Sequence, residues 1–345
     1  MITRFQPQRK RPRRQDSSLL MQKTLFDLDA RPRESFYFDR GLFLLPGHLG
    51  VDVRRRQQFG FISHAHMDHA ARHETILCTP ETAALVRHRI GETQYREMPL
   101  GEPIEFRQSR LTTVSAGHVL GSAMLLAEQD EGSMLYTGDY RLGESYTAGQ
   151  AELPHADVLV MECTFGDPFY RLPPRAETIA KFLDQVDQAF RIGATPIVHA
   201  YVLGKAQEVT KILTHHGIRV QQQQDVFAIS QIYEACGCDL GAYELYDGRP
   251  KQRHVVVSPP RSQRGSDVHG VVLAQHFAMT GWGWNPQLAA RYRCDHVVPL
   301  SDHADYGELL ETIEQVAPQR IYCTHGPKRF VDDLRGRGHQ AYWLG

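Results

Sequence analysis

The strongest constraint on this chain is the segment Ser63-His64-Ala65-His66-Met67-Asp68-His69, which places three histidines and an aspartate within six consecutive positions. Imidazole nitrogen and carboxylate oxygen are ligands that a divalent ion such as Zn²⁺ accepts. The apolar run from Phe59 to Ile62 predicts a buried strand directly before them. A strand end holds side chains rigidly and leaves one side open, so we predict a metal site there. His64 and His66 would face one ion, and Asp68 and His69 a second. A polar surface loop with chance histidines is the weaker alternative.

Length and charge narrow the class of protein. With 345 residues, the chain can hold two domains or one domain with a large insertion. A formal net charge of −1 gives no overall attraction to nucleic acid or membranes, so any polyanion site must be local. The six cysteines form no CxxC pair, and no signal peptide is evident, which indicates reduced thiols and a cytoplasmic protein. No apolar run reaches the roughly 18 residues that span a bilayer, so we expect no membrane partner.

Residues 1–34 carry little apolar periodicity and are predicted to form a flexible basic arm. Solvation of this arm is the favoured interpretation, because terminal charged segments are commonly solvated. The alternative is a contact with a phosphate backbone, whose strength would fall steeply with salt. Its basic residues are Arg4, Arg9, Lys10, Arg11, Arg13 and Arg14.

Further candidate ligands each follow a short apolar strand and a turn. The polar groups at these strand ends are His118, Asp139, Glu162, His303 and His325. One such residue would be weak evidence, but together with the histidine loop they imply a common sheet edge, where open α/β folds place their sites. Asp52 lies in the apolar segment Val51-Asp52-Val53 and needs buried partners. We predict that it accepts hydrogen bonds from the histidine loop.

In residues 170–290 the sequence pattern changes, and predicted strands and helices alternate. The predicted helices are 174–190, 203–215 and 225–235, and the predicted strands are 196–199, 218–220 and 254–257. This alternation predicts a small parallel α/β domain inserted into the chain. Gln221 to Gln224 is predicted to be a loop. The histidines of this segment are assigned to packing or to the surface: His199, His215, His216, His254, His269 and His276.

The ordered set of motifs resembles a known family. The series His64-x-His66-x-Asp68-His69, His118 and Asp139 is similar to the ligands of the metallo-β-lactamase fold. Glu162, His303 and His325 resemble motifs A, B and C of the β-CASP nucleases. The resemblance implies an α/β fold, a metallo-β-lactamase αββα sandwich with an inserted β-CASP α/β domain. The sandwich would comprise residues 35–169 and 291–345, and the insertion residues 170–290.

The resemblance also implies roles for the site residues. His64, His66 and His118 would bind one metal, Asp68, His69 and His325 the second, and Asp139 would bridge them. The implied cofactors are two Zn²⁺ ions, with Mn²⁺ as the alternative. Asp68, His303 and Glu162 would be the catalytic residues, with His303 as general acid and Glu162 orienting it and keeping it charged. Asp52 matches the family's first motif and would stay outside the ligand set.

Substrate contacts are less constrained by the sequence. Gly204 and Lys205 open a predicted helix, whose N–H groups and cation can face a phosphate; a solvated lysine is the alternative. Ser258 is assigned to the cleft by analogy with phosphate-binding loops in the family. Trp282 and Trp284 can stack on bases or pack in the core.

The sequence leaves DNA and RNA open as the substrate. A motif C histidine is typical of RNA-processing β-CASP enzymes, whereas residues 163–174 and 201–207 are similar to bacterial exonucleases associated with DNA ligase. We therefore expect a DNA exonuclease on single-stranded ends in DNA repair, with an RNA-processing nuclease as the alternative. A DNA ligase or helicase of a repair pathway is the expected partner. The full motif set disfavours a small-molecule hydrolase and a catalytically inactive scaffold.

Overall fold

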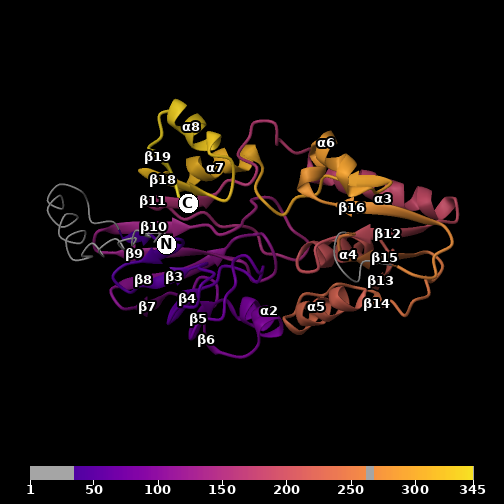
Figure 1. Cartoon of the computed structure of the whole chain (residues 1–345), viewed down its shortest axis with the longest axis horizontal. Helices are drawn as coiled ribbons and strands as arrows, with labels where there is room; N and C mark the ends of the chain where they lie inside the picture. Colours follow the sequence, from indigo (N-terminus) through magenta and orange to yellow (C-terminus); the bar gives the residue numbers. More distant parts are fainter. Residues whose placement is uncertain (1–34, 262–267, 345) are drawn as a thin grey trace, which may run out of the picture. The chain divides into compact units, whose positions relative to one another are not determined.

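The computed structural model describes residues 35–261 and 268–344, which form three sheets (Figure 1). The predicted basic arm, residues 1–34, lies outside the described residues. No helix in the described ranges is long and apolar enough to cross a membrane.

The first sheet has the order β1-β2-β3-β4-β5-β6. Its strands are β1 (Phe36–Phe38), β2 (Leu42–Leu44), β3 (Leu49–Val51), β4 (Phe59–Phe61), β5 (Thr75–Cys78) and β6 (Gln94–Glu97). Strands β3 to β6 run parallel, so the chain after β4 leaves the sheet at the same edge as the chain after β3 and β5. Helix α2 (Pro80–Ile90) follows β5 and is capped by Thr79, whose hydroxyl accepts the Thr82 N–H.

The second sheet has the order β19-β18-β11-β10-β9-β8-β7. Its strands are β7 (Ile104–Phe106), β8 (Ser109–Ser115), β9 (Ala123–Gln129), β10 (Gly132–Tyr136), β11 (Val158–Glu162), β18 (Arg320–Thr324) and β19 (Ala341–Trp343). Strands β10, β11, β18 and β19 are parallel. The polar groups that follow β10, β11 and β18 are therefore delivered to one edge, as the strand-end pattern predicts.

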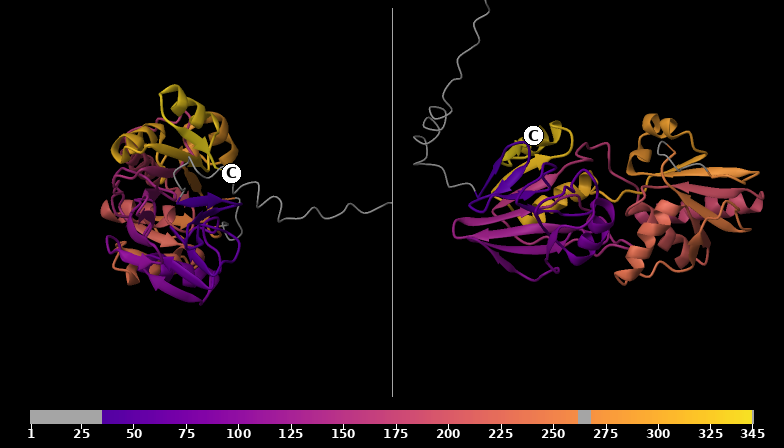
Figure 2. Two further views of the ribbon diagram at one scale, coloured as in Figure 1. Left: turned by 90° about the vertical axis from the view of Figure 1, so that its left-hand side faces the viewer. Right: turned by 60° about the horizontal axis from the view of Figure 1, so that its bottom comes forward.

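Two apolar layers hold these sheets together. On β11, Val158 and Val160 face the first sheet, whereas Leu159 and Met161 face the helices α7 (Tyr306–Val316) and α8 (Arg329–Gly336). This alternation follows from the two-residue period of a strand. Helix α2 packs on the outer face of the first sheet. The result is the predicted αββα sandwich, with the yellow C-terminal helices against the second sheet (Figure 2).

The third sheet is parallel throughout, in the order β14-β13-β15-β12-β16-β17. Its strands are β12 (Thr195–His199), β13 (Arg219–Gln222), β14 (Tyr243–Leu245), β15 (His254–Ser258), β16 (Ala274–Met279) and β17 (His296–Val298). Its helices are α3 (Arg175–Arg191), α4 (Lys205–His215) and α5 (Gln224–Ala235). The short helices η1 (Gly281–Trp284), α6 (Pro286–Ala289) and η2 (Ala290–Tyr292) precede β17. Because β17 pairs with β16, the inserted sheet extends past the predicted boundary at residue 290.

The predicted loop at Gln221 to Gln224 is wrong. Gln221 and Gln222 are fully buried at the end of β13, and Gln224 already begins α5. The Gln222 amide donates to the Thr210 hydroxyl at 2.8 Å, and the Gln221 side-chain oxygen accepts the Lys251 N–H at 2.9 Å. These distant partners pair with one end of each buried amide, which a polar run in isolation does not indicate.

Candidate active site

The histidine loop begins one residue after β4 and is anchored by a buried carboxylate. Asp52, whose side chain is 3% exposed, accepts the Ser63 N–H at 2.8 Å and the Ser63 hydroxyl at 2.6 Å. Its Oδ2 also accepts His69 Nδ1–H at 2.8 Å and the Tyr136 hydroxyl at 2.9 Å. Four donors compensate for the burial of this charge. Asp52 therefore joins the first residue of the loop, its last histidine and the end of β10.

Two histidines of the loop each use one ring nitrogen to contact the surrounding protein. His64 Nδ1 lies 3.0 Å from the Ser63 hydroxyl, which already donates to Asp52 and so accepts the imidazole proton. His66 Nε2 lies 3.1 Å from the carbonyl of Leu203 in the inserted domain and donates to it. In both rings the other nitrogen keeps its lone pair and faces the neighbouring histidines.

The third buried histidine is fixed in the same way by the loop before α7. His118 Nδ1 donates to the Asp302 carbonyl at 2.7 Å, which leaves Nε2 facing inward. Its backbone N–H donates to the Ser122 hydroxyl at 3.1 Å, which holds the turn after β8. Residues 184 positions apart are thus linked by one hydrogen bond that sets the tautomer of a candidate ligand.

The inward nitrogens have the spacing of ligands around one ion. His66 Nδ1 lies 3.0 Å from His64 Nε2 and 3.2 Å from His118 Nε2. Tetrahedral Zn²⁺ with bonds of about 2.0–2.1 Å places neighbouring ligands about 3.3 Å apart. Because the outer nitrogens carry the protons, these three atoms are acceptors that face one another. The donor set therefore fits a divalent metal.

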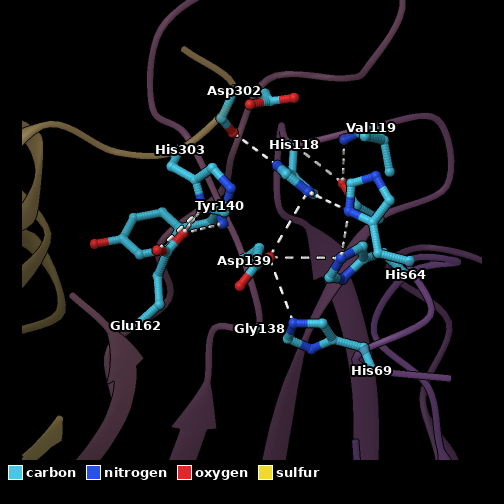
Figure 3. Close-up of polar contacts among 12 residues, drawn as sticks. His64, His69, His118, Val119, Gly138, Asp139, Tyr140, Glu162, Asp302 and His303 are labelled. Carbon is cyan, nitrogen blue, oxygen red and sulfur yellow. Dashed lines mark hydrogen bonds and ion pairs between the residues drawn. The ribbon is translucent and has the colours of Figure 1, made fainter. Parts of the chain in front are cut away.

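Asp139 lies at the middle of this cluster (Figure 3). Its Oδ2 is 3.4 Å from His69 Nε2, 3.6 Å from His64 Nε2 and 3.9 Å from His118 Nε2. The preceding Gly138 has φ +55°, and a Cβ there would lie 2.6 Å from the Ser63 hydroxyl oxygen. Only glycine allows this turn, which directs the carboxylate from the end of β10 toward the histidines.

The remaining candidate ligands form a more exposed group around His69. His69 Nε2 lies 3.8 Å from Asp68 Oδ2, and the His69 and His325 rings are 5.3 Å apart. The Asp68 side chain is 71% exposed. His325 has φ 52°, a strained backbone for a residue with a side chain, and the next residue, Gly326, packs directly on the Cys163 carbonyl. Three of the predicted ligands, His64, His69 and His118, thus face Asp139, and His66 lies beside two of them. Asp68 and His325 are more exposed and lie next to His69.

The pKa values of the histidines around Asp139 are shifted in two directions. Burial, reinforced by the neighbouring histidines, lowers the pKa of His64 well below its ordinary value and lowers that of His118. Burial also lowers the pKa of His66 to about 4. These rings are neutral at pH 7, as metal ligands must be. Burial would lower the pKa of His69 as well, but the carboxylates of Asp139 and Asp52 outweigh it and raise that pKa well above its ordinary value.

Next to the cluster, His303 is paired with a buried glutamate. His303 Nδ1 lies 2.9 Å and 3.1 Å from the two Glu162 oxygens, and Glu162 also accepts the Tyr140 N–H at 3.0 Å. The Thr164 hydroxyl donates to the same carboxylate. Burial opposes the charge on His303, but Glu162 and Asp139 outweigh it and raise its pKa to about 10. His303 is therefore cationic at neutral pH, with its Nε2 proton directed away from Glu162.

The site opens into a cavity of about 420 Å³. Asp68, Asp139 and His303 line one side of it, and Tyr201, Lys205 and Trp282 of the inserted domain line the other. This volume is within the range of small-ligand pockets. Trp282 packs on Phe165 with ring centroids 4.7 Å apart, whereas Trp284 does not line the cavity and donates to the Phe169 carbonyl.

The alternative of a solvated Lys205 is wrong, because its side chain is 1% exposed. Its Nζ lies 3.4 Å from Asp302 Oδ1 and 3.9 Å from Glu208 Oε2, without a hydrogen bond within the described residues. Helix α4 begins at Lys205, and a Cβ on Gly204 would lie 2.3 Å from Val119 Cγ1, which explains the glycine. A buried ammonium thus faces both the cavity and the loop that holds His303.

Ser258 lies outside the site to which its sequence position assigns it, whereas Asp302 makes contacts at the site that its sequence position did not predict. Ser258 is fully buried at the end of β15, and its hydroxyl donates to the Pro259 carbonyl. It does not line the cavity beside the candidate metal ligands. Asp302 was assigned no role, yet its carbonyl orients His118 and its carboxylate faces Lys205. Its position directly before His303 was the signal that could have identified it.

Comparison with known proteins gives the family context. Residues 290–343 match the Zn-dependent metallo-hydrolase RNA specificity domain. The chain is 36% identical over 312 residues to a protein of Opitutus terrae named probable DNA ligase, which covers 89% of this chain and 31% of that protein. It is 25% identical over 285 residues to 5′ exonuclease Apollo of Danio rerio, covering 75% of this chain and 46% of the relative.

A third relative is named RNase J-like protein, from Methanocaldococcus jannaschii, and is 29% identical over 190 residues. That match covers 48% of this chain and 45% of the relative. In each of these three matches the chain spans less than half the length of the relative. The similarity therefore concerns one part of each longer protein.

Proposed function

Because the chain belongs to the β-CASP family of the metallo-β-lactamase fold, a family of metal-dependent hydrolases, we propose that it is a nuclease that cleaves DNA from single-stranded ends. The observation that supports this proposal best is that four histidines and the Glu162–His303 pair lie around the same buried carboxylate, Asp139. The four histidines are His64, His66, His69 and His118. A phosphodiester substrate needs both a cationic centre and a proton donor for the leaving oxygen.

Two ions are proposed to bind at this centre. His64, His66 and His118 would hold one, Asp68, His69 and His325 the other, and Asp139 would contact both. When bound, such a pair polarises a phosphodiester and brings the pKa of water close to about 7. Asp52 keeps His69 in the tautomer that presents Nε2 to the centre.

The proton transfer is proposed to use His303. Its Nδ1–H bond to Glu162 fixes the ring and leaves Nε2–H for the oxygen that departs from phosphorus. The Glu162 carboxylate accepts three further hydrogen bonds, from the Tyr140 N–H, the Thr164 N–H and the Thr164 hydroxyl, and would stabilise the cationic ring. Once the proton has left, His303 is neutral and must be reprotonated from solvent through the cavity.

DNA is the proposed substrate, and RNA is the second candidate. DNA is supported by the likeness of nearly the whole chain to a protein named as a DNA ligase and by the likeness to a protein named as an exonuclease. RNA is supported by the match of residues 290–343 to a domain named for RNA specificity and by the RNase J-like relative. A DNA ligase is the proposed partner, because the protein named as a ligase contains a segment similar to this chain.

The test uses matched DNA and RNA strands labelled at either end, with Zn²⁺ or Mn²⁺ and with a chelator as control. We expect metal-dependent release of mononucleotides from one end of single-stranded DNA. Faster cleavage of RNA would favour the second candidate. Hydrolysis of a chromogenic lactam or thioester, with both strands intact, would contradict the proposal.

A further inference from the structure

A second cavity, of about 650 Å³, lies in the inserted domain where its parallel strands end. Residues directly after β12, after β15 and at the end of β16 contribute to its walls, and residues 291–294 close it. The second cavity shares Tyr201, Met279 and Thr280 with the cavity beside the metal ligands, so the two are neighbours. It contains none of the residues that the proposed reaction uses.

The sheet topology places this second cavity at a position suited to ligands. In the order of the sheet, β13 lies on one side of β12 and β16 lies on the other, so the chain moves in opposite directions along the sheet after β12 and after β15. Strands β15, β12 and β16 are therefore neighbours at the point where the winding direction changes. In open α/β sheets the crevice beyond the carboxyl ends at such a point is where ligands bind.

The charge of the second cavity is strongly one-sided. Three guanidinium groups, those of Arg261, Arg291 and Arg293, line it. None of the described residues in its walls is an aspartate or a glutamate. Arg261 Nη1 donates to the Arg293 carbonyl at 2.6 Å, which joins the two walls of the crevice. Asp295 directly follows this wall, where its carboxylate accepts the His276 N–H at 2.7 Å. Guanidinium groups gathered in this way are suited to phosphate, which they bind through paired N–H donors.

Three further residues of the walls are aromatic: His199, Tyr201 and Tyr292. Tyr201, which is 52% exposed, stands between the two cavities, and Tyr292 lies among the arginines. His199 is buried and stacked on His276 at an interplanar angle of 11°, with its Nδ1 donating to the Pro259 carbonyl. Aromatic faces beside cations are the combination with which proteins hold single-stranded nucleotides.

We propose that the second cavity binds a phosphorylated nucleotide, with its phosphate on the arginines and its base on an exposed tyrosine. The inference rests on the proposed nuclease function. Two sources can supply this ligand: a nucleotide of the bound strand distant from the scissile bond, or a free mononucleotide released by the reaction. The first would make the second cavity part of the substrate path, and the second would make it a site of product inhibition.

The experiment compares wild type with the Arg291→Gln/Arg293→Gln double variant. Binding of a phosphorothioate-linked oligothymidylate, which resists cleavage, is measured over a range of salt concentrations, and binding of thymidine 5′-monophosphate is measured by calorimetry. If the strand occupies the second cavity, the slope of log affinity against log salt falls by about 1.4, since each phosphate contact to a single strand contributes about 0.7. If the mononucleotide is the ligand, the slope is unchanged and calorimetry detects its binding only in wild type.

The matched control is Arg219→Gln/Arg249→Gln, which removes the same charge from exposed positions of the inserted domain outside the second cavity. The proposal is overturned if the two double variants bind strand and mononucleotide alike. Hydrolysis of bis(p-nitrophenyl) phosphate by wild type reports the chemistry separately. Failure of that hydrolysis contradicts the proposed function, whereas the binding comparison still decides whether the second cavity takes a nucleotide.

Discussion

The candidate metal site and the second cavity both collect polar side chains at the ends of strands. The first presents carboxylates and imidazoles, whereas the second presents guanidinium groups. In the sandwich, carboxylates and imidazoles follow the ends of strands and converge on Asp139. In the inserted domain, arginines and tyrosines gather at the ends of β12, β15 and β16. The comparison shows that the edge of a parallel sheet determines where side chains gather but not which residue types they are. The residues placed there decide whether it takes a cation or an anion.

Among the variants that test this comparison, Asp139→Ala should have the largest effect on hydrolysis and on metal content. The carboxylate faces His64, His69 and His118, and its removal takes away the oxygen proposed to contact both ions. We expect hydrolysis to become undetectable and the metal content, measured by elemental analysis, to fall. Full metal content with normal turnover would contradict the assigned centre. Strand binding at the second cavity should persist, because it depends on different residues.

His303→Ala should have the next largest effect and a different signature. A general acid typically contributes about 10²–10⁴-fold to a rate, so kcat should fall within that range. The metal content should remain that of wild type, because His303 is proposed to be outside the ligand set. A bis(p-nitrophenyl) phosphate substrate, whose leaving group needs little protonation, should be affected less than DNA. Equal losses on both substrates, or loss of metal, would exclude the acid role.

Asp52→Asn should weaken the metal centre without removing a ligand. Asparagine keeps the shape of the side chain but loses the charge that accepts four hydrogen bonds from Ser63, His69 and Tyr136. Loss of such a supporting group typically lowers metal affinity about 10–100-fold. Metal titration followed by activity measures this change, with Asp39→Asn as an exposed control. Unchanged affinity would show that the loop holds its geometry unaided.

The two sites also differ in how far the sequence could predict them. The proximity of the buried candidate ligands could be predicted because each one follows an apolar strand, and both signals lie within a few residues. The sandwich could be predicted for the same reason, since the alternation along β11 is local. The outer contacts of the ligands were not accessible, because His66 meets Leu203 and His118 meets Asp302 across more than a hundred positions.

Burial of polar residues was the main source of error. Lys205 and Gln222 have polar side chains that a sequence pattern assigns to solvent, yet both are buried against partners from other segments. Their burial depends on whether the fold supplies a carboxylate or a hydroxyl at the right distance. The arginines of the second cavity were missed because Arg261 and Arg293 are brought together only by the sheet topology.

The smallest expected effect is on the pH dependence of the free energy of unfolding, through His199, which lines the second cavity. Burial, with His276 and Arg261 nearby, lowers the pKa of His199 to about 4. The folded state therefore holds His199 neutral while the unfolded chain takes up a proton below about pH 6.5, so stability is lost as the pH falls from about 6.5 to 4. His199→Gln keeps a donor for the Pro259 carbonyl but does not titrate. Between pH 7 and 5 the variant should lose about 1–2 kcal/mol less stability than wild type in urea unfolding. Parallel losses in the two proteins would mean that His199 is already charged in the folded state, in which case a fourth cation would strengthen the attraction of the second cavity for phosphate.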